Sequence, residues 1–347
     1  MTYLDANASE PLRPEARAAV LAALDLAGNP ASVHAAGRAA RRVLEDARTA
    51  IAQRFGAATV VFTSGGTEAD AQAVAGLGAG RRVVVGATEH DAVAAAAPGA
   101  LVMPVDGDGV ADLDWLERTL QDGPALVCLM LANNETGTLQ PVAEAAALCR
   151  AHGARLHVDA VQARDGADLA ALGAHSMAVS SHKLGGPKGA GALLLADGVD
   201  AAPLIHGGQE RGRRGGTPAL PAIAGFAAAA GCAGPDLQPM RDAVVAAALA
   251  EGAVLLGGAR RLGNTACLAL PGVRADRQVI ALDLAGVQVS AGAACSSGKV
   301  GPSRVLQAMG CGDLAGQAIR VSLPWNASWA DVDAFAAAYR TLARRAA

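Results

Sequence analysis

Lys183 is the first candidate for covalent chemistry, because lysine is rare in this chain and Lys183 follows a strand-like run. Residues 176–180 (SMAVS) are rich in β-formers, and Ser180, His182 and Lys183 stand at their end, before a glycine-rich turn. The chain has three lysines among its 29 basic residues, namely Lys183, Lys188 and Lys299. A lysine at a strand end suits a Schiff base with an aldehyde cofactor, whereas Lys188 is typical of a loop. An ordinary surface position for Lys183 is the alternative.

A carboxylate stands 24 residues before this lysine, at the end of another strand-like run. Asp159 follows the buried-looking residues 154–158 (ARLHV), and Gln162 comes shortly after it. In open α/β sheets, ligands bind at the carboxyl ends of the strands. Asp159 could therefore hold a protonated ring nitrogen, with Gln162 on the same ligand. It could equally cap the N-terminus of a helix, and the residues alone leave both interpretations open.

Residues 59–70 (TVVFTSGGTEAD) have the pattern of a strand, a glycine turn and a helix start. Gly65 and Gly66 permit a sharp turn, and the free N–H groups and dipole of the following helix would make a natural phosphate site. The alternative is an ordinary turn in which Thr67 caps the helix. The segment is not a Walker A loop. No G-x-G-x-x-G sequence follows a strand in a βαβ setting, which disfavours a dinucleotide fold.

Cys295 differs in its surroundings from the other cysteines, which are at positions 128, 149, 232, 267 and 311. No two of the six form a C-x-x-C pair, which argues against a zinc ribbon and against thioredoxin chemistry. Cys295 stands in a loop of small residues, 288–298 (QVSAGAACSSG), whereas the others have the apolar surroundings of core thiols. A nucleophilic Cys295 would need activation, because a thiol of ordinary pKa is mostly protonated at pH 7.

The elements that must position these residues alternate between helical and β-rich patterns from residue 14 onward. The β-rich runs lie at 59–63, 82–86, 101–105, 125–131, 154–158, 176–180 and 191–195. Helical patterns lie at 14–27, 36–54, 67–77, 112–121 and 141–152. This alternation predicts an α/β domain with a largely parallel sheet covered by helices on both faces. After about residue 238 the pattern changes, which predicts a smaller C-terminal domain. Its helical patterns lie at 239–256, 302–310 and 330–346, and its strand-like pieces at 266–270 and 287–290.

The composition of the 347 residues sets limits on the class of protein. The length predicts about two domains. A content of 52% apolar and 18% charged residues excludes a disordered chain. The net charge of −3 argues against nucleic-acid binding by bulk positive charge. No signal peptide and no apolar run of about 20 residues is evident. We therefore expect a cytoplasmic protein with free thiols that binds neither membranes nor nucleic acid directly.

Eleven segments carry a resemblance to a known family. They are YLDANASEPL (3–12), NPASVHAAGR (29–38), FTSGGTEAD (62–70), TEHDAV (88–93), NNETGTLQPV (133–142), HVDAVQ (157–162), SSHKLGGPKGAGAL (180–193), GGQERGRRGGT (207–217), GAACSSG (292–298), PSRVLQAMG (302–310) and IRVSL (319–323). In this order, they resemble the pyridoxal-phosphate-dependent cysteine desulfurases of the NifS/IscS group, in the class V aminotransferase family. Any one segment is weak evidence, but the eleven together cover the chain nearly end to end.

The resemblance implies an aspartate-aminotransferase-like fold of the α/β class, known as fold type I. A large domain, residues 14–238, would contain a mostly parallel seven-stranded sheet and bind the cofactor. A smaller α+β domain would combine residues 1–13 with 239–347 and carry the loop of Cys295.

The resemblance also assigns a role to each candidate residue. Lys183 would form the Schiff base with pyridoxal 5'-phosphate, and Asp159 would pair with its pyridine nitrogen. His90, stacked on the ring, and Cys295, the sulfur-accepting nucleophile, would complete the catalytic group. The other contacts to the cofactor would come from Gly66, Thr67, Asn134, Gln162, Ser180, His182 and, from a neighbouring subunit, Thr217. Arg320 would bind the α-carboxylate of the substrate together with Asn134, since a guanidinium can grip a carboxylate through two parallel hydrogen bonds.

The implied activity is conversion of L-cysteine to L-alanine, with the sulfur left on Cys295 as a persulfide. The contact from Thr217 implies a homodimer. The sequence around Cys295 implies that the sulfur is delivered to an iron–sulfur scaffold protein or another sulfur acceptor. No resident metal is implied, although Cys295 could be a transient iron–sulfur ligand with a scaffold partner. A selenocysteine lyase, or another β-eliminating class V enzyme, is the alternative within the class. The non-enzymatic alternative is a degenerate homologue that acts only as a partner protein.

The chain departs from the family pattern in three places and is short for the group. Pro218 to Leu220 follow the GGT turn, SLPWNAS (322–328) lacks a common glycine, and Ala293 replaces a common serine. None of these removes a named catalytic group. These departures and the short chain leave three questions open: which protein accepts the sulfur, whether cysteine or selenocysteine is preferred, and whether a segment that docks a partner is present.

Overall fold

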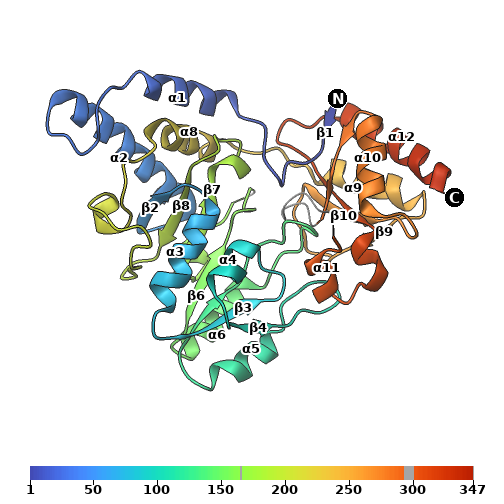
Figure 1. The fold of residues 1–347 in the computed structure, drawn as a ribbon, viewed down its shortest axis with the longest axis horizontal. Coiled ribbons are helices and arrows are strands. Elements are labelled where there is room, and N and C mark those ends of the chain that lie inside the picture. The colour runs from blue at the N-terminus through green and yellow to red at the C-terminus, as the bar shows by residue number, and fades with distance from the viewer. Residues whose placement is uncertain (165, 293–300, 347) are drawn as a thin grey trace.

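A seven-stranded sheet forms the centre of the larger part of the molecule (Figure 1). The computed structural model describes residues 1–164, 166–292 and 301–346. The strand order is β2-β8-β7-β6-β5-β3-β4. The strands are β2 (Thr59–Thr63), β3 (Arg82–Gly86), β4 (Leu101–Met103), β5 (Ala125–Cys128), β6 (Arg155–Asp159), β7 (Ser176–Ser180) and β8 (Gly191–Leu195). Of these strands, β8 runs antiparallel to its neighbours β2 and β7, and the remaining pairs are parallel.

Helices cover both faces of this sheet, because its strands are apolar on both sides. On one face, α3 (Gly66–Gly78) and α4 (Asp91–Ala96) contribute to a buried apolar cluster with the sheet. The opposite face is covered by α2 (Ala35–Phe55), α5 (Leu113–Leu120), α6 (Val142–Ala151) and α8 (Leu220–Ala230). The helix α1 (Pro14–Leu24) packs on α8, and the short α7 (Leu169–Leu172) precedes β7. In α2, the buried Leu44, Ala47, Ile51 and Phe55 recur at helical spacing, which makes the stripe that faces the core.

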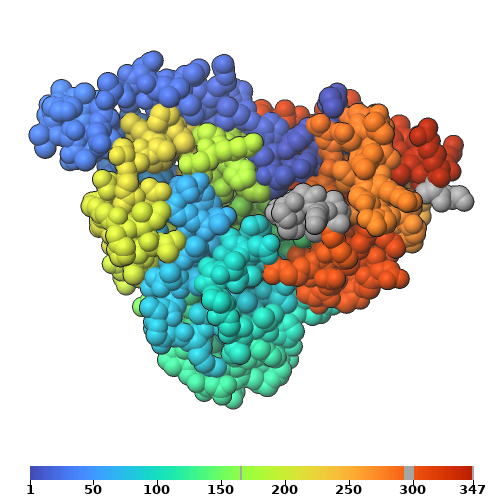
Figure 2. All heavy atoms as spheres, viewed as in Figure 1, coloured from blue at the N-terminus to red at the C-terminus, as the bar shows by residue number. Residues whose placement is uncertain are grey.

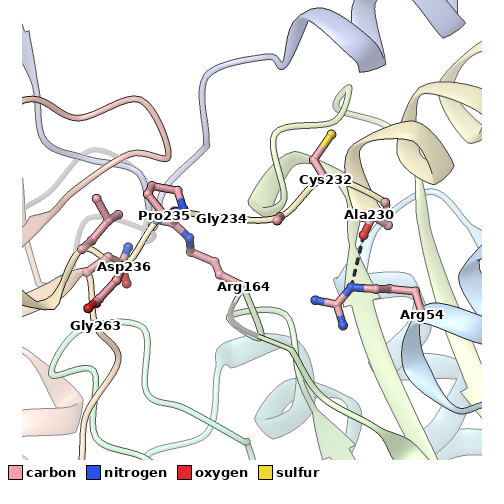
Figure 3. A pocket seen from close by; sticks show the side chains of 12 residues that line it. Arg54, Arg164, Ala230, Cys232, Gly234, Pro235, Asp236 and Gly263 are labelled. Carbon is pink, nitrogen blue, oxygen red and sulfur yellow. Dashed lines mark hydrogen bonds between the residues drawn. The ribbon is translucent and has the colours of Figure 1, made fainter.

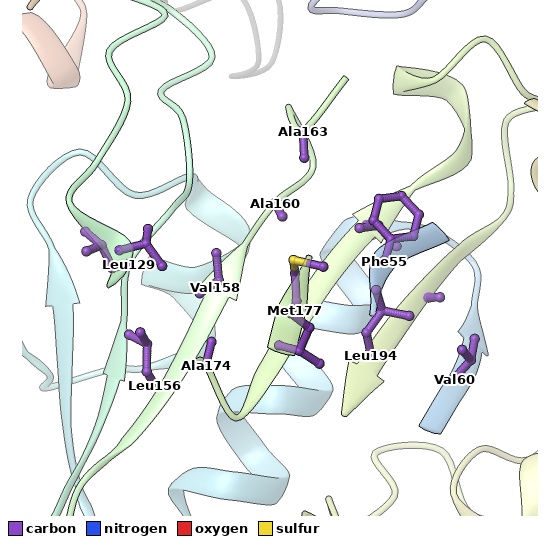
Figure 4. Close-up of a cluster of buried hydrophobic side chains, with 14 of the residues drawn as sticks. Phe55, Val60, Leu129, Leu156, Val158, Ala160, Ala163, Ala174, Met177 and Leu194 are labelled. Carbon is purple, nitrogen blue, oxygen red and sulfur yellow. The ribbon is translucent and has the colours of Figure 1, made fainter. Parts of the chain in front are cut away.

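The alternation of side chains along β6 decides what reaches the functional site. Leu156 and Val158 lie in the apolar cluster on the α2 and α6 side (Figure 4). Because successive residues of a strand point to opposite faces, His157 and Asp159 face α3. The strand therefore places one buried imidazole and one buried carboxyl group on the same side of the sheet.

The smaller part of the molecule is built on a four-stranded antiparallel sheet of order β12-β13-β10-β9. Its strands are β9 (Val254–Leu256), β10 (Thr265–Ala269), β12 (Ser290–Ala291) and β13 (Ala318–Ser322). Its helices are α9 (Gln238–Leu249), α10 (Ala275–Leu284), α11 (Arg304–Ala308) and α12 (Trp329–Ala346). The first three residues of the chain add β1 (Thr2–Tyr3), which pairs in parallel with β11 (Val287–Gln288). Within the described residues, no helix has the length and apolarity that crossing a bilayer requires.

The N-terminal segment belongs physically with the C-terminal elements. Leu4 is fully buried in the apolar cluster formed by α9, β10, β13 and α12. In the space-filling view, the first residues (dark blue) lie beside the orange C-terminal elements, while α1 and α2 extend over the larger part (Figure 2). This packing supports the division into 14–238 and 1–13 with 239–347, which stays a prediction.

The structure confirms the α/β class and the seven strands expected from the sequence, and it corrects one helix. The pattern at 239–256 predicts a single helix, but α9 ends at Leu249 and β9 follows. Gly252, with φ of +86°, takes a left-handed conformation that breaks the helix. The helix α10 (Ala275–Leu284) was not expected from the sequence.

Candidate active site

A cavity of about 300 Å³ lies where β6 and β7 end and α3 begins. It stands at the carboxyl edge of parallel strands, where α/β sheets bind ligands. Ten of the twelve residues predicted from the sequence line it: Gly66, Thr67, His90, Asn134, Asp159, Gln162, Ser180, His182, Lys183 and Arg320. The fold thus brings together side chains from widely separated parts of the chain.

Lys183 projects into this cavity from a short 3₁₀ turn, Ser181–Lys183, that follows β7. Its Nζ donates to the backbone oxygens of Asn7, at 2.5 Å, and Ala8, at 3.2 Å. Gln162 Nε2 donates to the same oxygen of Asn7, at 3.2 Å. The N-terminal segment therefore positions the amine of Lys183.

Asp159 ends β6 and is buried, with 7% of its surface exposed. Its Oδ1 accepts the N–H of Val161 at 2.9 Å, which makes a turn; no helix begins at this residue. Burial, and then the neighbouring Asp70, raise the pKa of Asp159 to about 7. A positively charged group placed beside Asp159 would stabilise its ionised form, so the cavity has a position for a protonated ring nitrogen.

The helix α3 begins at Gly66 and points its first turn toward this cavity. Its N-cap is Gly65, so Thr67 does not cap the helix. A Cβ atom at Gly66 would stand 2.5 Å from Val161 Cγ2, so a larger residue there would require the side chain of Val161 to shift. The first N–H groups of a 13-residue helix, with Ser180 nearby, form an anion site.

His182 and His90 both line the cavity, and hydrogen bonds orient their rings. Burial, and then Lys183, lower the pKa of His182 to about 4, and its Nδ1 lies 3.3 Å from Ser9 Oγ. His90 is the N-cap of α4, and its Nδ1 accepts the N–H of Ala92 at 3.1 Å. In its neutral form, His90 therefore carries its proton on Nε2.

Arg320, on β13, closes the cavity from the smaller part of the molecule. Its Nη2 donates to Asp5 Oδ1 at 2.7 Å, and its Nη1 donates to the backbone oxygen of Asn134 at 3.2 Å. Its Nε is buried without a hydrogen-bond partner among the described residues. A buried donor of this kind is costly unless a ligand satisfies it, and a carboxylate matches the guanidinium.

Two predicted residues are not placed in this cavity. Thr217 is exposed and lines a separate hollow of about 130 Å³ with Ser64 and Arg214, so its contact with a neighbouring subunit stays a prediction. Cys295 lies outside the described residues. The loop before Thr217 is nevertheless well fixed, because Arg48 binds the carboxylate of Glu210 through two hydrogen bonds, of 2.7 and 3.0 Å.

We expect Arg48→Met to lower the free energy of unfolding by about 3–5 kcal/mol, because it leaves the buried Glu210 carboxylate without its charge partner. Glu210 Oε2 also accepts the N–H of Phe62, at 2.9 Å, so the loss would reach the sheet. Urea denaturation measures the effect. The control is Arg211→Met, whose ion pair with Glu45 is largely exposed, and for which a change below about 1 kcal/mol is expected. Equal losses in both variants would contradict this account.

Sequence reasoning did not assign a role to Asn7, which joins three parts of the chain at the cavity. Its Nδ2 donates to the backbone oxygen of Asn134 at 3.0 Å and to Thr265 Oγ1 at 2.9 Å, and its Oδ1 accepts from Asn264 at 3.1 Å. The segment YLDANASEPL contributed to the family resemblance, but nothing in its sequence distinguished Asn7 from its neighbours. Asp70, which also lines the cavity, was missed as well.

A larger cavity, of about 600 Å³, lies near the start of α9 and contains none of the predicted residues (Figure 3). Arg54, Arg164 and Cys232 line it, and Arg54 Nε donates to the oxygen of Ala230 at 3.1 Å. Although this cavity is larger, it lacks the set of an amine, a carboxyl group and a helix N-terminus that the smaller cavity contains. The smaller cavity is therefore the candidate active site.

The groups around the smaller cavity fit pyridoxal 5'-phosphate. They comprise an amine for an aldehyde, a buried carboxyl group for a ring nitrogen, an amide for a phenolic oxygen and a helix N-terminus for a phosphate. A bound phosphate would lie at the backbone of Gly66, where no side chain stands in the way. A substrate carboxylate would lie at Arg320, whose Nε has no hydrogen-bond partner among the described residues.

Comparison with known proteins agrees with this chemistry. The family model for class V aminotransferases matches residues 2–335. A cysteine desulfurase of Cereibacter sphaeroides is 42% identical over 95% of this chain and 92% of that protein. An IscS-like cysteine desulfurase of Mycobacterium tuberculosis is 40% identical over 96% of this chain and 94% of that protein. The crystal structure of a NifS-like protein from Rickettsia africae covers 99% of both chains, with a TM-score of 0.91 and 29% identity. The chain therefore belongs to the class V aminotransferase family, in the group that contains the cysteine desulfurases.

Proposed function

We propose that the protein is a cysteine desulfurase, which converts L-cysteine to L-alanine and passes the sulfur to Cys295. The observation that carries the proposal is the cavity in which Lys183, Asp159 and Arg320 meet. An amine, a buried carboxyl group and a carboxylate-binding guanidinium are what the reaction of an amino acid with an aldehyde cofactor requires. The named relatives at 40–42% identity favour the sulfur chemistry over the selenocysteine alternative.

The cofactor would be held from several sides. Lys183 would bind its aldehyde carbon, Asp159 its ring nitrogen and Gln162 its phenolic oxygen, with His90 on the face of the ring. The phosphate would be held by Gly66, Thr67, Ser180 and His182, and by Thr217 of a second copy. When bound, pyridoxal phosphate supplies an aldehyde that takes up the substrate amine and a ring that accepts electrons from its α-carbon.

The residues of the chain would then carry out the transfer of protons and of sulfur. Lys183 Nζ, freed when the substrate amine takes its place, removes the proton from the α-carbon of L-cysteine. The Cys295 thiolate attacks the substrate sulfur, so that a sulfur–sulfur bond forms and the carbon–sulfur bond breaks. The electron pair of that bond stays on carbon, which takes up protons and leaves as L-alanine. The sulfur remains as a persulfide on Cys295.

Arg320→Gln is expected to lower kcat/KM for L-cysteine by about 100-fold, mainly through KM, because it removes the charge that meets the substrate carboxylate. Binding of the cofactor should not change. Steady-state kinetics with L-cysteine measure the effect. Asp5→Asn is the control: it breaks the ion pair with Arg320 but leaves the guanidinium in place, and it should change KM much less. An unchanged KM in Arg320→Gln would place the carboxylate site elsewhere.

The decisive experiment measures alanine formed from L-cysteine by the protein loaded with pyridoxal phosphate, in the presence of a reducing thiol that clears the persulfide. We expect alanine and sulfide in equal amounts. A protein that binds the cofactor but forms alanine only from L-selenocysteine would contradict the proposal. A protein that does not bind the cofactor would contradict the assignment of the cavity as well.

We further propose a homodimer, an iron–sulfur scaffold or other acceptor protein for the sulfur, and a cytoplasmic location. The exposed position of Thr217, outside its own subunit's cavity, supports a role in the site of a second copy. The five described cysteines are unpaired, which suits a reducing compartment.

A further inference from the structure

Three buried carboxyl groups lie together at the base of the candidate active site. Asp70 and Glu89 are each 1% exposed, and Asp159 is 7% exposed. The ionisable groups that interact with these acids come from several elements of the described chain. They are His90 before α4, Cys128 on β5, His157 on β6 and the basic Arg304 on α11. So many acids in one buried place cannot all be ionised, because each charge is costly away from water.

A hydrogen-bonded chain connects one of these acids to the sheet. Asp70 Oδ1 lies 3.1 Å from His157 Nε2, and His157 Nδ1 lies 2.8 Å from Ser176 Oγ. All three side chains are buried, and Ser176 stands directly opposite His157 in the pairing of β6 with β7. Both ring nitrogens of His157 are therefore engaged, and its orientation toward Asp70 is fixed.

The chain places this pair next to the carboxyl group that faces the cofactor site. His157 and Asp159 are two residues apart on β6 and share its α3 face. Asp70 and Asp159 both line the cavity, whereas His157 and Ser176 lie behind it. A charge on Asp70 would consequently be felt by Asp159.

Burial disfavours a charge on each of these groups. It raises the pKa of Asp70 to about 7 and lowers the pKa of His157 to about 4. It also raises the pKa of Glu89 well above its usual range, which favours the neutral form of this carboxyl group. A single proton held between Asp70 and His157 satisfies their hydrogen bond, and the pair is then uncharged overall, whichever atom holds the proton.

We propose that Asp70 and His157 are a positioning pair that shares one proton, carries no net charge and so leaves Asp159 as the ionised member of the three buried acids. This inference rests on the proposed function, in which the Asp159 carboxylate pairs with the protonated ring nitrogen of the cofactor. Neither Asp70 nor His157 needs to touch the cofactor for this role. Their effect is to keep a second negative charge away from Asp159.

The test is the affinity of the cofactor-free protein for pyridoxal phosphate, measured as a dissociation constant between pH 5 and pH 9. In the wild type, affinity is present where Asp159 is ionised and is lost as the pH falls through its pKa. His157→Gln keeps hydrogen-bonding groups but cannot accept the shared proton, so Asp70 is charged beside Asp159 at pH values above its own pKa of about 7. The loss of affinity should then begin about one pH unit higher, with about tenfold weaker binding below it.

The double variant distinguishes this role from a merely structural one. Asp70→Asn combined with His157→Gln contains no charge at the pair, so its pH profile should return to within about threefold of the wild type. Damage to packing would instead add up, and the double variant would then be the weakest binder.

Glu89→Gln is the matched control, because it removes a buried acid whose neutral form burial already favours and keeps the acceptor for the N–H of Met130. It should leave the pH profile in place. The proposal is overturned if His157→Gln does not shift the profile, or if the double variant fails to restore it. Circular dichroism checks folding, and should His157→Gln not fold, Ser176→Ala should give a smaller shift in the same direction. A wild type that does not bind pyridoxal phosphate would instead refute the proposed function.

Discussion

Replacing Lys183 with alanine is expected to remove the covalent attachment of pyridoxal phosphate and to lower alanine formation by a factor on the order of 10⁴. Lys183 is the lysine of the cavity, and its amine serves both to hold the aldehyde carbon and to move the proton of the substrate. Reduction with borohydride followed by mass spectrometry shows the attachment directly. Alanine release from L-cysteine gives the rate.

Lys188→Ala is the matched control for this variant, because Lys188 is exposed and follows the same strand. It should keep the attached cofactor and nearly the full rate. Since the amine of Lys183 also donates to the oxygens of Asn7 and Ala8, its loss is expected to loosen the N-terminal segment slightly. Cofactor still attached covalently in Lys183→Ala would assign the Schiff base to another amine.

Replacing Cys295 with alanine is expected to lower alanine formation from L-cysteine by a factor on the order of 10³ or more, while cofactor binding stays unchanged. The argument combines the sequence with the positions of the other thiols. None of the five described cysteines lines the candidate active site. Cys128, Cys149 and Cys267 are buried, and burial raises the pKa of each thiol, which makes it a poor nucleophile.

Cys311→Ala and Cys232→Ala are the controls for Cys295→Ala. Cys311 packs beside an apolar cluster of the smaller part of the molecule, and Cys232 lines the larger cavity away from the site. Both variants should release alanine at close to the wild-type rate. Labelling of the persulfide after one turnover, followed by peptide mapping, should find the extra sulfur on Cys295. An extra sulfur on Cys311 would contradict the assignment.

The residues that could be predicted from the sequence are those whose position follows from local structure. Asp159 is the last residue of β6, Lys183 comes three residues after the end of β7, and Gly66 begins a helix after a glycine turn, so the parallel sheet brings them to one edge. The resemblance to a family supplied the remaining assignments, including Arg320. The alternation of strands and helices stops after residue 238, and this is the basis for the division into a larger and a smaller domain, which stays a prediction.

The residues that could not be predicted depend on contacts between distant segments. Asn7 is structurally important because it forms hydrogen bonds with Asn264 and Asn134, and Asp70 because it forms one with His157. No local pattern records such contacts. The end of α9 was also missed, because the apolar run continues past Leu249 while a single glycine at 252 ends the helix.

The position of the N-terminal segment has a consequence for the biosynthesis of the enzyme. Residues 1–10 are synthesised before the elements that they contact, since Leu4 binds the backbone of Gln288, and Asn7 binds Ser322, 315 residues later in the chain. The acceptors of the Lys183 amine can therefore be fixed in place only after residues up to Ser322 have been made. The larger part can fold earlier, but a nascent chain lacks a finished catalytic cavity. Completion of the catalytic cavity is therefore expected to follow synthesis of the C-terminal elements that hold residues 4–7.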